Sequence, residues 1–184
     1  MQRDLVMAAK RGDHEAFEAL AVGAADRLYR IARLILRDVY LAQDAVQETL
    51  VRAWRQMPTL RDPERFDAWL RRLLISACAD EGRQARRRSP EIHVVGVEPS
   101  IDDDAGQVAD RDLLERGFRR LRPQHRAALV LHFYLGLPAS EVADALGVPE
   151  GTAKSRIHYA TQALRAALDA DERDAKVTRN GRSA

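Results

Sequence analysis

The sequence is poor in several residue types, and each scarcity excludes a class of protein. Cys78 is the one cysteine among 184 residues, which excludes an internal disulfide framework and a multi-cysteine metal site. No apolar run approaches the roughly 18–20 residues of a membrane-spanning helix, and the first residues do not have the pattern of a signal peptide. We therefore expect a cytoplasmic protein without membrane insertion. Aromatic residues make up only 5% of the chain, which predicts a mostly aliphatic core.

The motifs of catalysis and metal binding are also missing. The five histidines, His132 among them, show no metal-ligand spacing. The sequence contains neither a phosphate-binding loop nor a nucleophile elbow, and it has no carboxylate pair with a framing pocket. We expect no catalytic residue, no metal and no cofactor, and we interpret Cys78 as a small packing residue.

Charge is abundant but unevenly distributed, although the net charge is only +2. Residues 1–88 hold 17 basic and 13 acidic side chains, and residues 111–170 hold nine basic and six acidic ones. Between them, residues 89–110 hold six acidic side chains and no lysine or arginine. The near-neutral total therefore conceals two basic segments, suited to contact phosphates, around an acidic connector.

Apolar residues recur at helical spacing throughout, without a useful strand pattern, so we predict an all-α fold. The predicted architecture is two small helical domains joined by a flexible linker. The first domain covers 1–88, the acidic linker 89–110, the second domain 111–170 and a disordered polar tail 171–184. The expected helices span about 4–11, 14–36, 41–57, 63–88, 111–121, 123–135, 139–146 and 149–168, and Gly23 is a candidate bend in the second of them.

The most specific local pattern runs from Ser140 to Arg156. Small Ala143 permits a close helix crossing, and Gly147 permits a left-handed turn between a short helix and a longer one. This spacing predicts a helix-turn-helix, whose second helix enters the major groove of DNA. A plain helical hairpin with a solvated face is the alternative. The predicted DNA-binding residues are Glu150, Gly151, Thr152, Lys154, Ser155, Arg156, His158 and Tyr159, and Gln162 shares the outward face.

Two helices of the first domain carry further candidate surfaces. A polar stripe on helix 41–57 suits the docking of a partner helix, although a solvated surface has the same pattern; its members are Asp44, Gln47, Glu48, Arg52 and Arg55. On the next helix, Phe66 and Trp69 lie among arginines. Aromatic rings can stack on unpaired bases while arginines follow phosphates. The alternative is that both rings belong to the core.

Together these segments resemble the extracytoplasmic-function (ECF) sigma factors, the group IV specificity subunits of bacterial RNA polymerase in the sigma-70 family. Asp44 to Trp54 resembles the region 2 helix that grips the polymerase clamp. Phe66 to Leu73 resembles the helix used in promoter melting, and Leu121 to His158 resembles region 4, which reads the minus-thirty-five element. The order of the segments and the intervening linker also match.

The resemblance implies a role for each matching position. The stripe from Asp44 to Arg55 would bind the clamp helices of the β′ subunit, and the loop from Pro58 to Arg65 would hold a flipped base of the minus-ten element. Other implied partners are the polymerase β flap, promoter DNA and an anti-sigma factor. The residues expected to contact the minus-ten region are Arg61, Arg65, Phe66, Trp69, Arg72, Ser76, Arg83, Arg86, Arg87 and Arg88.

The sequence departs from the family pattern at a few positions. Ser76 stands where the family often has asparagine, which leaves minus-ten base selection open. Ala153 replaces a larger aliphatic residue, and Tyr159 and Thr161 stand where further arginines are usual. We therefore expect weak binding by isolated region 4. The acidic linker is either an ordinary tether or a mimic of RNA charge in the polymerase channel.

Two other functions compete with an initiation factor that recognises both promoter elements and promotes melting. A stand-alone helix-turn-helix regulator would dimerise on a palindrome and act without polymerase. An enzyme with a helical core would need a catalytic constellation, which the sequence lacks.

Overall fold

Aspartate caps fix the start of the long helices in the first half of the chain. The Asp13 carboxylate accepts a hydrogen bond from the backbone N–H of Ala16 at 3.0 Å and begins α2 (His14–Leu36). The Asp38 carboxylate accepts from the N–H of Leu41 at 2.9 Å and begins α3 (Val39–Gln56). Between them, Arg37 ends α2 in the left-handed conformation with φ of 62°. The connection between the two helices is therefore as short as two residues.

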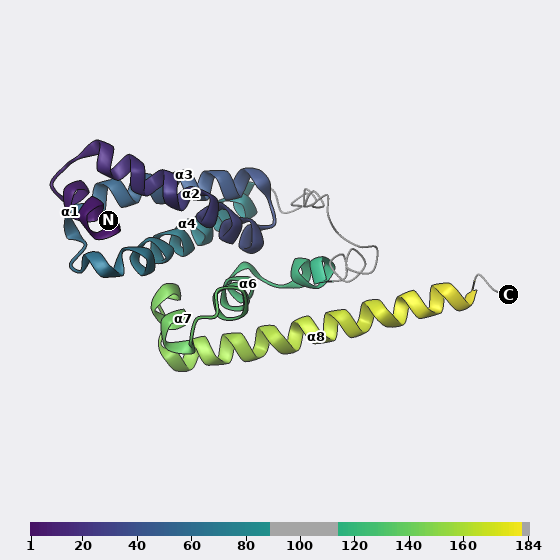
Figure 1. The fold of residues 1–184 in the computed structure, drawn as a ribbon. Coiled ribbons are helices and arrows are strands. Elements are labelled where there is room, and N and C mark those ends of the chain that lie inside the picture. Colours follow the sequence, from purple (N-terminus) through teal and green to yellow (C-terminus); the bar gives the residue numbers. More distant parts are fainter. Residues whose placement is uncertain (89–113, 182–184) are drawn as a thin grey trace.

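The computed structural model describes residues 1–88 and 114–181. In the first domain, α1 (Gln2–Lys10), α2, α3 and α4 (Phe66–Arg88) pack against one another (Figure 1). Two short 3₁₀ turns, η1 (Met57–Thr59) and η2 (Pro63–Arg65), connect α3 to α4. Over the described residues the secondary structure is helical with no strand, which confirms the predicted all-α class.

The second domain contains the predicted helix-turn-helix. Residues 114–120 are helical and are followed by α6 (Pro123–Leu129) and a π-helix, η3 (Val130–Tyr134). α7 (Ala139–Leu146) ends at Gly147, whose φ of 63° makes the left-handed turn into α8 (Glu150–Gly181). Figure 1 shows α8 running beneath the other helices and projecting beyond them.

The two domains pack directly against each other. α4 contacts α7, α2 contacts α6, and one hydrophobic core cluster draws side chains from both domains. Arg126 of α6 is only 8% exposed and donates from Nε to the carbonyl oxygen of Ile35 at 2.5 Å. Arg37, at the end of α2, pairs with Glu115 of the second domain. Buried arginines therefore join surfaces that are mainly apolar.

The structure differs from the sequence-based expectations in some details. α2 continues through Gly23 without interruption, because its apolar face packs on both sides of that position. α8 continues to Gly181, so residues 171–181 are helical where a disordered tail is expected; no glycine or proline occurs between Thr152 and Asn180 to end the helix. The predicted acidic linker, 89–110, lies outside the described residues.

Candidate nucleic-acid interface

The outward face of α8 has the exposure expected of a recognition helix. Ala153 and Ala160 are fully buried and Ile157 is 9% exposed, so these residues seat the helix on its own domain. Thr152 and Arg156 are half-buried at the edges of this contact. The exposed residues follow one another along the opposite face, and they are Glu150, Gly151, Lys154, Ser155, His158, Tyr159 and Gln162.

Local contacts on this face leave several donors available to a ligand. Lys154 Nζ lies 2.8 Å from the Glu150 carboxylate, and both side chains are exposed, so this ion pair is weak and exchangeable. The Ser155 hydroxyl donates to the carbonyl oxygen of Thr152 at 2.9 Å and keeps its lone pairs free to accept. Lysine, serine and histidine on one helical face can read base edges in a major groove.

Phe66 and Trp69, the two candidate aromatic residues at the start of α4, differ in their exposure. Phe66 is 3% exposed and belongs to the hydrophobic core cluster, so it is a packing residue and not part of the exposed surface. Trp69 is partly exposed, with its ring centroid 5.9 Å from that of Phe66. Phe66 therefore supports the ring of Trp69, and Trp69 alone of the pair presents an edge to the outside.

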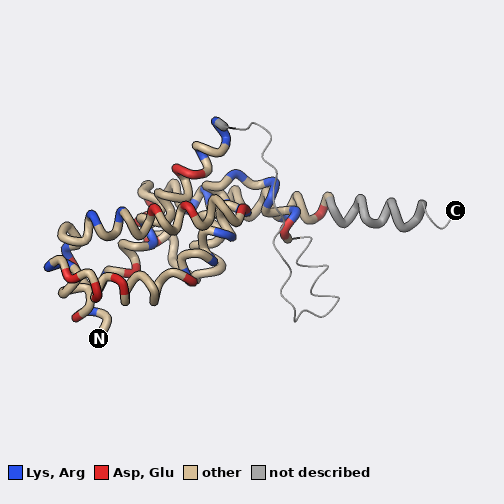
Figure 2. The backbone as a smooth tube through the Cα atoms, turned by 90° about the horizontal axis from the view of Figure 1, so that it is seen from above, with Lys and Arg blue, Asp and Glu red and all other residues tan. Residues whose placement is uncertain are grey.

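Exposed arginines occur before α4 and along it. Arg61 and Arg65 are exposed in the connection before α4, and Arg72 and Ser76 are exposed on the helix itself. The Ser76 hydroxyl accepts a hydrogen bond from Arg52 of α3 at 3.4 Å. Arg83, Arg86 and Arg87 are exposed near the end of the helix, where Figure 2 shows a run of basic positions; the Arg88 side chain lies outside the described set.

The polar stripe on α3 contains three exposed residues and two residues that form ion pairs. Asp44, Gln47 and Arg55 are exposed. Glu48 and Arg52 pair at 2.7 Å, and Arg52 also pairs with Asp80 of α4 at 2.9 Å. The hydrogen bond from Arg52 to Glu48 raises the pKa of the Arg52 guanidinium. This network fixes α3 against α4, and sequence periodicity could not indicate Asp80 as the partner of Arg52.

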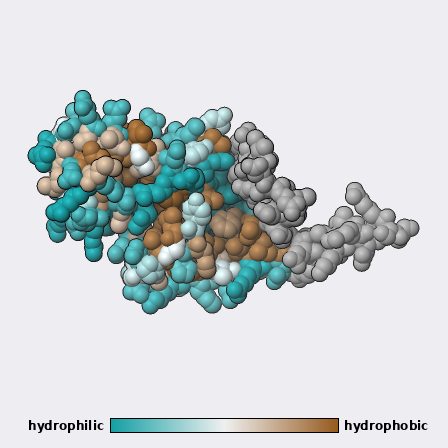
Figure 3. Space-filling view, viewed as in Figure 1, coloured by the Kyte–Doolittle hydropathy of each residue, from teal (hydrophilic) through white to brown (hydrophobic). Residues whose placement is uncertain are grey.

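Phe133 and Tyr134 form an exposed aromatic pair that the sequence analysis does not place on any candidate surface. They are 63% and 54% exposed. The wider turn of the π-helix η3 changes the angular register after Val130 and turns both rings outward. They line an open apolar hollow of about 430 Å³, whose other residues include Leu34, Leu114, Phe118, Leu164 and Leu168. Figure 3 shows a hydrophobic area in this part of the molecule, above α8.

Next to this apolar hollow lies a basic one. Arg30 and Arg33 of α2, and Arg37 that follows it, line a space of about 480 Å³ together with Glu115 and Tyr134. The Glu115 carboxyl is partly buried, which alone would raise its pKa, but hydrogen bonds from Arg119 and Arg37 lower the pKa below its usual value. Glu115 is therefore charged at neutral pH and partly neutralises the arginines.

The described residues give little support to metal binding or to reaction at the cysteine thiol. Among residues 1–88 and 114–181, the side chains form no cluster of three or more His, Cys, Asp or Glu suited to a metal ion. Burial raises the pKa of the Cys78 thiol to about 12, so the reactive thiolate is scarce. His132 is partly buried, with Nδ1 2.8 Å from the carbonyl oxygen of Leu137. In the part of the chain that is described, the helices are too short or too polar to span a membrane.

Comparison with known proteins agrees with this geometry. Residues 23–88 match the family model of sigma-70 region 2, and residues 114–166 match that of sigma-70 region 4. The chain is 38% identical over 149 residues to the ECF RNA polymerase sigma factor SigL of Mycobacterium tuberculosis, covering 77% of this chain and 82% of SigL. It is 34% identical over 166 residues to the RNA polymerase sigma-E factor of Streptomyces avermitilis, covering 90% and 92% of the two chains.

Solved structures show the same fold. CnrH, solved with the cytosolic domain of CnrY, superposes with a TM-score of 0.64 at 28% identity, over 92% of this chain and 98% of CnrH. RpoE of Bartonella quintana, at 24% identity, has a TM-score of 0.69 over 84% of this chain and 98% of its own. With both regions matched, the helix-turn-helix in place and relatives aligned over most of their length, the chain belongs to the ECF sigma factors of RNA polymerase.

Proposed function

We propose that α8 reads the minus-thirty-five element through Lys154, Ser155 and His158. The observation that carries this assignment is the division of α8 into a buried face and an uninterrupted exposed face, directly after the left-handed turn at Gly147. Lys154 supplies charge for phosphate or guanine, and Ser155 and His158 supply hydrogen-bonding groups for base edges. Thr152 and Arg156, at the edges of the face, would contact the backbone.

The minus-ten element would bind the other domain. The loop that contains Arg61 and Arg65 and the exposed edge of Trp69 form a surface with both charge and an aromatic face, as the binding of unpaired bases requires. Arg72, Arg83, Arg86 and Arg87 are exposed along α4 and would follow the phosphates. Ser76 is exposed but also bonded to Arg52, so its selectivity for a base depends on releasing that arginine.

Polymerase would be bound at two separate surfaces. The exposed residues Asp44, Gln47 and Arg55 of α3 would contact the β′ clamp helices, while Glu48 and Arg52 hold α3 in place and contribute their outer atoms. The apolar hollow beside Phe133 and Tyr134 would take an apolar segment of the β flap, because exposed aromatic rings gain most from being covered.

Promoter binding would require the two domains to separate. The two elements lie about 25 base pairs apart, which is about 85 Å of duplex at 3.4 Å per base pair. In the structure α4 packs directly against α7, the first helix of the helix-turn-helix. The packed arrangement therefore cannot engage both elements at once, and it would be the form that exists away from promoter DNA.

A protein partner would act on the packed form. CnrH, a relative of known structure, was solved in complex with the cytosolic domain of another protein. We propose an anti-sigma factor as the corresponding partner of this chain, a cytoplasmic site of action with polymerase, and no catalytic activity of its own.

The test of these assignments uses the full chain bound to core polymerase. The Lys154→Ala and His158→Ala variants should change which minus-thirty-five sequences are bound, with minus-ten preference unchanged. Trp69→Ala should leave duplex promoter binding in place and reduce promoter melting, measured by permanganate reactivity of unpaired thymines. Normal melting with Trp69→Ala, or unaltered sequence preference with both α8 variants, would contradict the assignment concerned.

A further inference from the structure

The first helix, α1, precedes the segment that matches sigma-70 region 2, and it borders the surface proposed to bind the minus-ten element. The match begins at residue 23, whereas α1 ends at Lys10. Val6 and Ala9 of α1 are buried in the core cluster, so the helix is seated on the first domain. α1 contacts both η1 and η2, the two turns that connect α3 to α4. We call this connection, residues 57–65, the minus-ten loop.

Lys10 holds the middle of the minus-ten loop from outside the loop. Its Nζ donates a hydrogen bond to the carbonyl oxygen of Leu60 at 2.5 Å. The side chain of Leu60 is 5% exposed and belongs to the core cluster. The peptide plane that contains this carbonyl group also contains the N–H of Arg61, whose side chain is exposed. Lys10 and the core therefore fix the peptide plane from which Arg61 extends.

The other hydrogen bonds of the minus-ten loop are local. In the part of the chain that the structure describes, they join residues a few positions apart, such as the bond from the Glu64 N–H to the Asp62 carboxylate at 3.0 Å. Arg3 of α1 also pairs with Glu64 at 3.5 Å, but both side chains are well exposed, so this ion pair is weak. Local bonds set the shape of each turn. The position of the loop on the domain therefore depends on Lys10 and on the buried side chains of the loop.

The start of α4 is held to the domain separately from the loop. The Asp67 carboxylate accepts hydrogen bonds from Arg27 of α2 at 2.6 Å and from Gln2 of α1 at 3.3 Å. Trp69, whose exposed edge is proposed to meet an unpaired base, follows Asp67 by two residues. Lys10 therefore acts on the loop side of the proposed minus-ten surface and leaves the Trp69 side to other contacts.

We infer that Lys10 is a positioning residue for minus-ten recognition. Its hydrogen bond to Leu60 holds the loop so that Arg61 is presented to the same unpaired base as Trp69. Such contacts must be placed to within about 0.5 Å, so a loop that is released at Leu60 discriminates poorly among bases. Lys10 itself acts through the loop and does not contact the DNA. This inference rests on the proposed binding of the minus-ten element at this surface.

The measurement is the affinity of the complete holoenzyme for fork-junction DNA, in which a duplex with the minus-thirty-five element continues into an unpaired minus-ten strand. The bases of that strand are varied one at a time. Lys10→Met keeps the length of the side chain and removes the donor. It should reduce the preference for the best base about tenfold at one position, the scale of one hydrogen bond from a charged group. Lys10→Arg keeps a charged donor and should retain the preference of the wild type.

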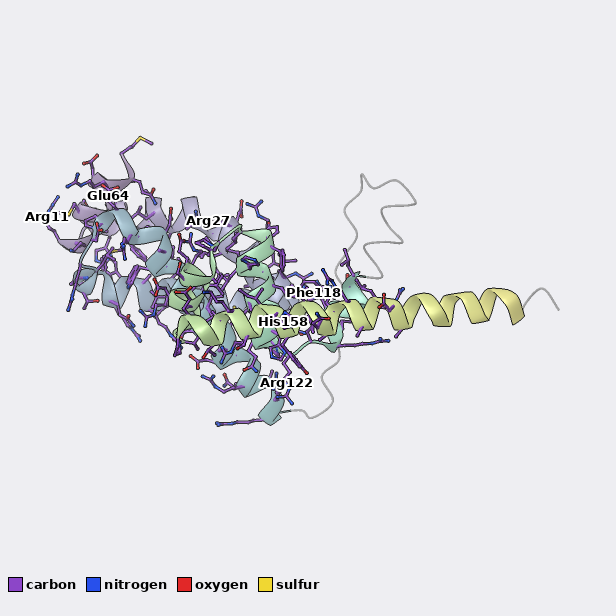
Figure 4. The ribbon with its side chains drawn as sticks, turned by 90° about the horizontal axis from the view of Figure 1, so that it is seen from below. Arg11, Arg27, Glu64, Phe118, Arg122 and His158 are labelled. Carbon is purple, nitrogen blue, oxygen red and sulfur yellow. The ribbon has the colours of Figure 1, made fainter. Side chains whose placement is uncertain are left out.

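Arg11→Gln is the matched control, because Arg11 is exposed, follows Lys10 directly and contributes the same charge. Figure 4 shows Arg11 and Glu64 at the same end of the molecule, so both substitutions change the charge near the minus-ten loop. Arg11→Gln should leave the base preference unchanged. The slope of log K against log salt should be the same in Lys10→Met and Arg11→Gln, because a residue that acts through the loop neutralises no phosphate. Helical circular dichroism verifies that each variant is folded.

Failure of the inference and failure of the proposed function give different results. If Lys10→Met keeps the base preference while Trp69→Ala weakens binding of the unpaired strand, Lys10 does not position the loop and the minus-ten assignment stands. If neither variant changes binding of the unpaired strand, the surface does not bind the minus-ten element and both assignments are wrong.

Three other results would overturn the inference alone. Equal weakening for every base would indicate a general loss of structure. A preference that Lys10→Arg fails to retain would show that the charged donor is not what matters. A salt slope lower by about one in Lys10→Met than in Arg11→Gln would show that Lys10 contacts a phosphate directly.

Discussion

The pair between Arg37 and Glu115 should control how firmly the two domains are held together. The side chains of Arg37 and Glu115 are only 8% and 15% exposed, and they come from different domains. Arg119 also contacts the Glu115 carboxylate, at 3.0 Å. In Glu115→Gln the packed form would keep a buried arginine without its counter-ion, whereas separated domains would let water reach Arg37.

The size of the effect follows from burial. Removing one partner of a buried ion pair costs about 3–5 kcal/mol, and the glutamine side chain can still accept a hydrogen bond, so we expect a value near the lower end. About 3 kcal/mol corresponds to a change of about 100-fold in the ratio of packed to separated molecules. By contrast, Arg71 and Glu141 also join the domains but lie 3.9 Å apart, with Glu141 53% exposed. Glu141→Gln should change the free energy by less than about 1 kcal/mol.

Energy transfer between dyes on the two domains measures this equilibrium. Val22→Cys on α2, which is 73% exposed, and Gln162→Cys on α8 provide the labelling sites, and Cys78 is too buried to react. We expect high transfer in the wild type and in Glu141→Gln, and a shift toward low transfer in Glu115→Gln with helical circular dichroism unchanged. Equal transfer in Glu115→Gln and Glu141→Gln would refute the reasoning.

Three further outcomes follow from burial and charge. The pKa of Glu115 is lowered from its usual 4.5, so its carboxylate stabilises the packed form above that pH, and this stabilisation is lost as the pH falls through the lowered pKa. Transfer between the dyes should therefore decrease on acidification below about 4.5 in the wild type, and decrease less in Glu115→Gln. The buried Cys78 thiol, with its pKa raised to about 12, should react with a disulfide reagent only on unfolding, and rapid reaction of the native protein would contradict its role in packing. Ala153 is fully buried, so Ala153→Val should overpack the contact under the recognition helix and destabilise the protein by about 1–3 kcal/mol, measured by urea unfolding, with Ala166→Val at an exposed position of α8 as control.

Local sequence signals predict the second domain well. Gly147 is required for the left-handed turn, and the spacing of Ala153, Ile157 and Ala160 defines the buried face of α8, so the exposed face follows directly. The caps at Asp13 and Asp38 also act within a few residues of their positions. Information of this kind is contained in a short window of sequence.

The features that the sequence does not indicate depend on contacts between distant segments or on irregular backbone. Arg126 bonds to Ile35, 91 residues away, and no periodicity indicates that pairing. The π-helix at Val130–Tyr134 rotates Phe133 and Tyr134 outward, which a constant period of 3.6 residues cannot predict. Phe66 lies on the apolar face expected from spacing, and its burial decides between the two readings of that pattern in favour of packing.

Run-off transcription tests the assigned function most directly. Core RNA polymerase, shown to be active with another sigma subunit, is incubated with promoter DNA from the region upstream of the gene for this chain, with and without the full chain. We predict a discrete transcript only when the chain is present, lost in a double variant Lys154→Ala, Trp69→Ala. The absence of a transcript with active core enzyme, or a transcript of equal yield without the chain, would contradict its role as an initiation factor.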